Sequence, residues 1–200
     1  MLEGILCLHH NGIFEGLPRV GELFRCSGED GSDPVQVTIR LPPKQRKRKG
    51  FQIDAGQSVN IYIPSLGLRS KFQTHPFVVA SWTGKRPTEL KLLIEPRGRW
   101  TQKLQSRAST ESGQTGGLGW VIFTGPHGTP VPIEDYEYVV MVADGYGIVA
   151  QLPLLERLVQ GALAREVRSR RIRLVWEFQN IGESYLVRIY LSDHMSPRPL

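Results

Sequence analysis

The stretch Tyr138–Gly147, YVVMVADGYG, divides the sequence into two parts of different character. It begins with a continuous apolar run, which is typical of a parallel strand covered on both faces. A glycine turn follows, and apolar residues then recur every three or four positions from Ile148 to Leu163, which predicts an amphipathic helix. The next apolar run, Ile172–Trp176, predicts a second strand. Strand, glycine turn, helix and strand together form a βαβ unit, the opening of a nucleotide-binding domain.

The residues before this stretch are predicted to be mainly β-structure. Apolar and polar residues alternate at 35–41 and at 59–63, a period of two that buries one face of a strand. A single helix is predicted near Arg99–Ala108. Short antiparallel strands at this spacing favour a closed barrel over a doubly wound sheet. The remaining predicted strands are at 76–82, 90–95 and 119–124.

The composition predicts a reduced, intracellular and soluble protein. With 40% hydrophobic residues in a chain of 200, there is enough apolar material for one good core or two small ones. Cys7 and Cys26 have neither metal-type spacing nor a disulfide framework, and the neighbouring His9 and His10 do not make a metal site. No apolar stretch approaches the roughly 18 residues that cross a bilayer.

The net charge of +6 is concentrated in two clusters, at Lys44–Lys49 and at Arg165–Arg173. The rest of the chain is slightly acidic, so the high pI does not by itself indicate a nucleic-acid partner. No stacking aromatic residues are interleaved with the charges, which makes nucleic acid the least favoured partner. Lys44–Lys49 is interpreted either as a solvated loop or as a patch that contacts anionic lipid.

Five short motifs occur in a fixed order along the chain. They are Ala55-Gly56-Gln57, His75-Pro76-Phe77 with Ser81, Gly98-Arg99-Trp100-Thr101, Gly125-Pro126-His127-Gly128 and Gly145-Tyr146-Gly147. This series resembles the ferredoxin-reductase-type flavoproteins, and its second and fourth motifs resemble the ferric reductase and NADPH oxidase branch. The strings LPLLERL at 152–158 and RRIRLVW at 170–176 are similar to the fungal ferric reductases. One such motif is a weak signal, whereas five in register are a strong one.

The resemblance extends from about Pro34 to Trp176 and implies a two-domain organisation. Residues 34–133 would form a six-stranded antiparallel Greek-key barrel that binds FAD. Residues 134–200 would form a Rossmann-like βαβ domain that binds NAD(P)H, and residues 1–33 an N-terminal extension. Because a complete α/β domain usually takes about 100–150 residues, we expect this nucleotide-binding domain to be truncated.

By the resemblance, His75, Pro76 and Phe77 line the flavin, with Ser81 nearby. A flavin needs a flat apolar wall with few donors near its reactive edge, and a proline-fixed backbone beside an aromatic ring provides one. Taken alone, Phe77 is better explained as a core residue and His75 as a surface histidine, and only the company of the other motifs favours the flavin role. The family often has a Thr or Ser where this chain has Val78, so that hydroxyl contact is expected to be absent or replaced by a backbone amide.

Two predicted helix starts contain glycine and suit phosphate groups, because a helix N-terminus exposes unpaired N–H groups and a positive dipole end. At the first start, the resemblance implies that Gly98 and Thr101 contact the FAD pyrophosphate, although Thr101 is also suited to capping the helix. At the second, Gly145 and Gly147 are predicted to bind the pyrophosphate of NAD(P)H.

Gly125 and Gly128 lie in the segment that joins the two predicted domains. In the resembling family this loop is at the flavin end of the cleft, where nicotinamide approaches. A rigid hinge turn explains its glycines and proline equally well.

The resemblance implies an oxidoreductase module that passes electrons from NAD(P)H through FAD toward haem, and then to ferric iron or to oxygen. The haem would belong to a transmembrane part outside this chain, and the module would lie at the cytoplasmic face of the membrane. An inactive FAD-binding or interaction module is the alternative. Glu177 favours an unphosphorylated ribose, whereas the Arg165–Arg173 cluster favours a 2′-phosphate, so NADH and NADPH both stay open.

Overall fold

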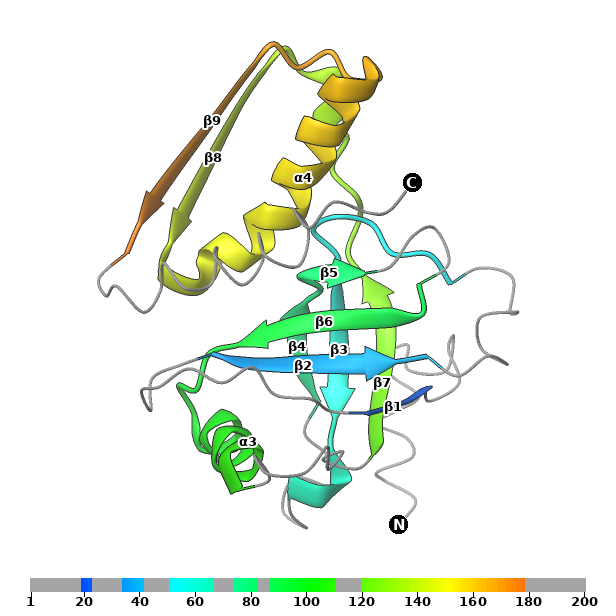
Figure 1. Cartoon of the computed structure of the whole chain (residues 1–200), viewed down its shortest axis with the longest axis vertical. Coiled ribbons are helices and arrows are strands. Elements are labelled where there is room, and N and C mark those ends of the chain that lie inside the picture. Colours follow the sequence, from blue (N-terminus) through cyan, green and yellow to red (C-terminus); the bar gives the residue numbers. More distant parts are fainter. Residues whose placement is uncertain are drawn as a thin grey trace.

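The structure, a computed structural model, describes residues 19–22, 34–41, 51–66, 74–82, 87–110 and 120–178. A β-rich body occupies one half of the molecule, and a smaller layer of two strands and a long helix packs against it (Figure 1). The elements of the body are β1 (Arg19–Glu22), β2 (Val35–Arg40), β3 (Ser58–Tyr62), η2 (Pro64–Leu66), β4 (His75–Val78), β5 (Ser81–Trp82), β6 (Glu89–Ile94), α3 (Arg99–Thr110) and β7 (Trp120–His127).

The described strands of the body form two antiparallel sheets. One has the order β1-β7-β3-β4 and the other β2-β6-β5. The strands of one sheet run across those of the other in Figure 1, and the alternating apolar residues of both fill the space between them. Helix α3 covers one end of this core, where Leu104 is fully buried. The predicted helix near 99–108 is therefore confirmed and is slightly longer.

The chain passes from one sheet to the other at Val79 and Ala80. The Val79 amide donates to the Gln57 carbonyl oxygen beside β3 (3.0 Å), whereas the next amide, of Ala80, donates to the Lys91 carbonyl oxygen in β6 (2.9 Å). A corner of this kind is how orthogonally packed sheets share a chain. It also divides the predicted strand at 76–82 into β4 and β5.

The predicted closed six-stranded barrel is not what the described residues form. The two sheets meet at the Val79–Ala80 corner, but no hydrogen-bonded ladder joins β1 to β2 in the described part of the chain. Instead, β2 pairs along its whole length with β6, and β1 pairs with β7. The sheets are therefore joined by the corner and by packing of their apolar faces.

The second half of the structure contains the predicted βαβ unit. Its elements are η4 (Ile133–Asp135), β8 (Tyr138–Asp144), η5 (Gly145–Gly147), α4 (Ile148–Ala164) and β9 (Arg171–Glu177). Strands β8 and β9 are parallel, with Tyr138 opposite Arg171 and Asp144 opposite Glu177. A larger Rossmann-like sheet is not established by the described residues, in which only β8 and β9 belong to this layer.

Helix α4 covers one face of the β8–β9 pair. Met141 and Ala143 are buried on this face, whereas Val140 and Val142 on the other face are 65% and 67% exposed. The prediction that YVVMVA is covered on both faces is therefore wrong for the described residues, because all helical cover comes from one side (Figure 1).

Several sequence features lie outside the described residues, namely Cys7, His9, His10, Cys26, Lys44–Lys49 and most of the polar segment at 109–117. In the described part of the chain, no helix has the length and apolar character needed to cross a membrane.

Candidate functional site

Strand β4 places His75 and Phe77 side by side on one face. They pair with Ile61 and Val59 of β3, whose side chains are fully buried, whereas the intervening Pro76 is exposed on the opposite face. Strand β4 is the edge strand of its sheet, the position in which a proline within a strand is tolerated. The alternation of the strand thus separates Pro76 from the other two residues of its motif.

The ring of Trp100, at the start of α3, completes an aromatic group with His75 and Phe77. Its centroid is 4.3 Å from the His75 imidazole, with an interplanar angle of 31°. The Phe77 ring is stacked with it at 6.0 Å and 23°. Trp100 and Phe77 are only partly buried at the border of the large core, so the group combines an apolar surface with access from outside.

The imidazole of His75 has an unsatisfied nitrogen. Its Nε2 atom is buried and has no hydrogen-bond partner among the described residues. Burial lowers the pKa of His75 below its ordinary value of 6.5, because desolvation disfavours the charged ring. A neutral imidazole with an unused polar atom is a group that a bound polar ligand would satisfy.

Gly98 and Thr101 form the start of α3. The Thr101 hydroxyl accepts from the Gly98 amide and donates to the Gly98 carbonyl oxygen, both at 2.9 Å. Thr101 therefore fills the capping role in this structure. Neither packing nor a positive φ requires glycine at 98, since an added Cβ would meet only the Thr101 hydroxyl oxygen, 4.0 Å away. That open space fits close approach of a phosphate group.

Gly145 and Gly147 form the short turn η5 before α4. Gly145 is buried, and its carbonyl oxygen accepts from the Trp176 indole N–H of β9 at 2.9 Å. Gly147 has nothing within 4 Å of an added Cβ, so it too leaves open space at a helix start. Tyr146 of this turn packs against an apolar cluster that includes Ala80. The turn therefore lies next to the Val79–Ala80 corner, where the chain passes from one sheet to the other. Asp144 makes no capping hydrogen bond there.

Gly125, Pro126 and His127 form an irregular end of β7, and Gly128 directly follows this strand. Ser58 pairs with His127 and Asn60 with Thr124, so β7 has one more residue than β3 between these pairs. The bulge contains Gly125, with φ 125°, and a cis peptide bond to Pro126. The motif is therefore a bulged strand end within the sheet of the body.

Gln57 connects this bulged segment to the Ala55-Gly56-Gln57 motif. Its Nε2 donates to the Gly128 carbonyl oxygen at 2.8 Å, and its Oε1 accepts from the Asp54 amide at 2.9 Å. Two motifs separated by about 70 residues are therefore tied by one side chain.

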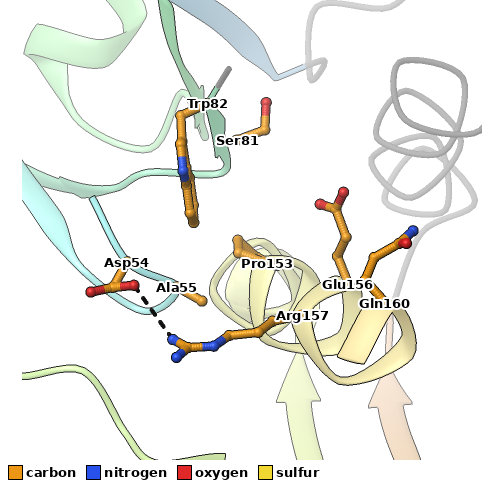
Figure 2. A pocket seen from close by; sticks show the side chains of 8 residues that line it. All are labelled: Asp54, Ala55, Ser81, Trp82, Pro153, Glu156, Arg157 and Gln160. Carbon is orange, nitrogen blue, oxygen red and sulfur yellow. Dashed lines mark ion pairs between the residues drawn. The ribbon is translucent and has the colours of Figure 1, made fainter. Parts of the chain in front are cut away.

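Ser81 is buried and lines a cavity of about 210 Å³ between the body and α4. Figure 2 shows the Trp82 ring and the Asp54 carboxylate on one side and α4 residues on the other. Across this cavity, Arg157 makes an ion pair with Asp54 at 3.5 Å. Arg157 also makes an ion pair with Glu134, which does not line the cavity. The full lining is Asp54, Ala55, Ser81, Trp82, Pro153, Glu156, Arg157 and Gln160.

The predicted site residues therefore fall into separate places. His75 and Phe77 meet Trp100 and, next to it, the Gly98–Thr101 helix start. The other predicted residues lie at the α4 cavity (Ser81), at the start of α4 (Gly145 and Gly147), at the end of β7 (Gly125) and just after it (Gly128), and on the outer face of β4 (Pro76).

Trp100 and Arg157 were not among the residues predicted for these places. Both residues lie within quoted strings, Trp100 in the Gly98–Thr101 motif and Arg157 in LPLLERL at 152–158, and these strings are the signal that could have found them. In the described residues, no group of three or more His, Cys, Asp or Glu side chains is arranged to bind a metal.

Comparison with known proteins identifies the family. A family model described as an FAD-binding domain matches residues 31–131. Ferric reduction oxidase 2 of Arabidopsis thaliana is 30% identical over 132 residues, 66% of this chain and 18% of the relative. Dual oxidase 1 of Caenorhabditis elegans is 28% identical over 149 residues, 72% of this chain and 9% of the relative. The chain belongs to the FAD-binding domain family of ferric reductases and NADPH oxidases.

Solved structures agree with this assignment at the level of the fold. The ferredoxin NADP+ reductase of Neisseria gonorrhoeae, solved with bound FAD and NADP, has a TM-score of 0.58 at 16% identity, covering 90% of this chain and 65% of that chain. The cytochrome b5 reductase domain of Ulva prolifera nitrate reductase has a TM-score of 0.51 at 12% identity, covering 90% and 70%. This FAD-binding domain therefore has a ferredoxin-reductase-like fold built on antiparallel sheets.

The chain spans about a fifth of the length of the ferric reduction oxidases that it matches, and less of the dual oxidase.

Proposed function

We propose that this chain is an electron-transfer module that binds FAD at the aromatic group of β4 and α3 and receives electrons from NAD(P)H. The observation that carries the proposal is the unpartnered, buried Nε2 of His75 beside the Phe77 ring, in a member of an FAD-binding family. An aromatic surface with one unused polar atom suits a flat ring that has both apolar faces and polar edges.

In this proposal the phosphates of FAD approach the start of α3. Gly98 leaves the space for them, and the first N–H groups of the helix supply donors. The Thr101 hydroxyl, which caps the helix in this structure, would donate a hydrogen bond to a phosphate oxygen if it rotated toward the ligand. Ser81 is the predicted flavin neighbour for which the geometry gives the least support, because it is buried beside α4.

Gly145 and Gly147 are proposed to receive the pyrophosphate of NAD(P)H at the start of α4. The open space at Gly147 supports this role, as does the position of the turn next to Ala80, where the chain leaves β4. In this arrangement Gly125 and Gly128 shape the backbone between the two halves rather than contact the dinucleotide. Bound FAD would supply the chemistry that converts a two-electron hydride donor into a source of single electrons.

The finer architecture belongs to the same proposal. We infer a barrel-type FAD domain at 34–133 after an extension at 1–33, and a Rossmann-like nucleotide domain that begins at 134. The ferredoxin-reductase-like fold neighbours support this division, as does the parallel βαβ unit.

The electron acceptor is proposed to be the haem of a membrane domain, with ferric iron as the final substrate. The similarity to ferric reduction oxidases supports this choice. Oxygen as the final acceptor is the second candidate, which the similarity to a dual oxidase supports. The module would then lie at the cytoplasmic face of the membrane, where the basic residues of Lys44–Lys49 would contact anionic lipid.

Titration of the purified chain with FAD tests the central claim. We expect saturable binding with a shifted flavin spectrum, followed by bleaching of the flavin when NADH or NADPH is added without air. The ratio of the two bleaching rates would decide between the cofactors. A well-folded chain that stays colourless after incubation with FAD would refute the proposed function.

A further inference from the structure

Trp100 connects the glycine-containing start of α3, proposed to bind phosphate, with the aromatic surface of β4, proposed to bind the flavin ring. Its backbone belongs to the first turn of α3, two residues after Gly98, where N–H groups have no partner within the helix. Its side chain lies against strand β4, with the indole 4.3 Å from the His75 ring. One residue therefore has its amide at the glycine-containing helix start and its ring at the aromatic surface.

The indole also accounts for part of the shielding of His75. Its ring is tilted by 31° from the imidazole and is stacked with the Phe77 ring at 23°, so the indole lies close to both side chains. Core packing alone does not require this arrangement, because Trp100 and Phe77 are only partly buried beside the core. An aromatic ring at an accessible border is suited to stacking with another flat ring.

We propose that Trp100 is a third FAD-binding residue, whose ring forms part of the flavin surface together with His75 and Phe77. The proposal rests on the proposed function and adds a residue to it. Replacing Trp100 should have two separate effects. The FAD affinity should fall because stacking area is lost, and the fluorescence of bound flavin should rise, since an adjacent indole quenches an excited flavin by donating an electron and taking it back.

The test compares Trp100→Ala, Trp100→Phe and Trp82→Phe in the full chain. Trp82 is the matched control because its ring also packs at the border of the same core but lines the cavity beside α4 (Figure 2). We expect Trp100→Ala to weaken FAD binding about tenfold and Trp100→Phe about threefold. Both variants should give brighter bound flavin, whereas Trp82→Phe should match wild type in affinity and brightness.

The outcomes separate this inference from the proposed function. If the wild-type chain binds FAD and both Trp100 variants show the same FAD affinity and flavin fluorescence as wild type, the inference is overturned and the proposed function stands. Wild-type chain that does not bind FAD would overturn both. Thermal unfolding of the FAD-free variants controls for loss of structure, and Trp100→Phe, which keeps an aromatic ring in the same place, decides the question if Trp100→Ala fails to fold.

Discussion

Gly125 is a residue whose identity is required by the backbone. Its φ of 125° lies in a region that other residues rarely adopt, and an added Cβ would be 3.0 Å from the Ser58 carbonyl oxygen. We expect Gly125→Ala to lower the free energy of unfolding by about 1–3 kcal/mol, measured by urea denaturation. Gly147→Ala is the control, because φ is −58° there and an added Cβ meets nothing within 4 Å. Equal losses in the two variants would contradict this explanation.

His75 should make the stability of the FAD-free chain depend on pH. Its pKa is lowered by burial, so the unfolded chain binds a proton more readily than the folded one. The neutral ring contributes fully to the free energy of unfolding at pH values above the unfolded-state pKa of 6.5. This contribution is lost as the pH falls below 6.5 toward the lowered folded-state pKa. Urea midpoints measured across this range should fall with acidification in wild type and fall less in His75→Gln. If the midpoints of wild type and His75→Gln fall in parallel, His75 is not the group that causes the loss of stability.

Helix α4 is oriented on the body by an arginine as well as by apolar packing. Leu152 of α4 is buried in a cluster with Ala80 of the body, and Arg157 pairs with Asp54 of the body and with Glu134 in the connecting segment. The pairing is imperfect, because the Arg157 Nη1 and a Glu134 carboxylate oxygen are buried without hydrogen-bond partners in the described residues. The ion pairs therefore fix the position of the helix more than they stabilise the fold.

The variant Arg157→Met tests how much these ion pairs stabilise the fold. We expect a loss of about 0.5–1.5 kcal/mol in the free energy of unfolding, since the side chains are partly exposed and screened by solvent. The difference from wild type should shrink with added salt. Arg168→Met, at an exposed position, is the control for removing one positive charge. A difference that does not depend on salt would indicate that the aliphatic part of Arg157 matters more than its charge.

At the scale of the molecule, the outer face of the β8–β9 pair is an exposed apolar surface among the described residues. Tyr138, Val140 and Val142 are each more than 60% exposed and follow one another along one face of β8, opposite Arg171, Arg173 and Val175 of β9. Contiguous apolar surface of this kind favours association between molecules.

We therefore expect the purified chain to self-associate as its concentration rises, and the double variant Val140→Thr, Val142→Thr to do so less. Sedimentation velocity at several concentrations measures the effect. Val159→Thr, which removes an exposed valine from α4 instead, is the control. A wild-type chain that stays monomeric over the whole series would contradict the prediction.

The local patterns of the sequence determined much of this protein. The apolar period of two at 59–63 predicted β3, and the spacing from Ile148 to Leu163 predicted α4, because both depend on residues a few positions apart. The order of the five motifs indicated the family that the comparisons show. The exposed outer face of YVVMVA could not be predicted, since an apolar run looks the same whether one or two layers cover it.

Only the tertiary structure decided how the candidate site is assembled. The change of sheet between Val79 and Ala80 depends on two carbonyl groups far away in sequence, those of Gln57 and Lys91. The stacking of Trp100 on His75 joins a helix start to an edge strand 25 residues earlier, a contact that no local spacing encodes. The sequence alone thus determined which chemical groups the chain carries and in what order. Long-range packing decided which of them meet, because their contacts depend on how the two sheets and α3 are folded over one core.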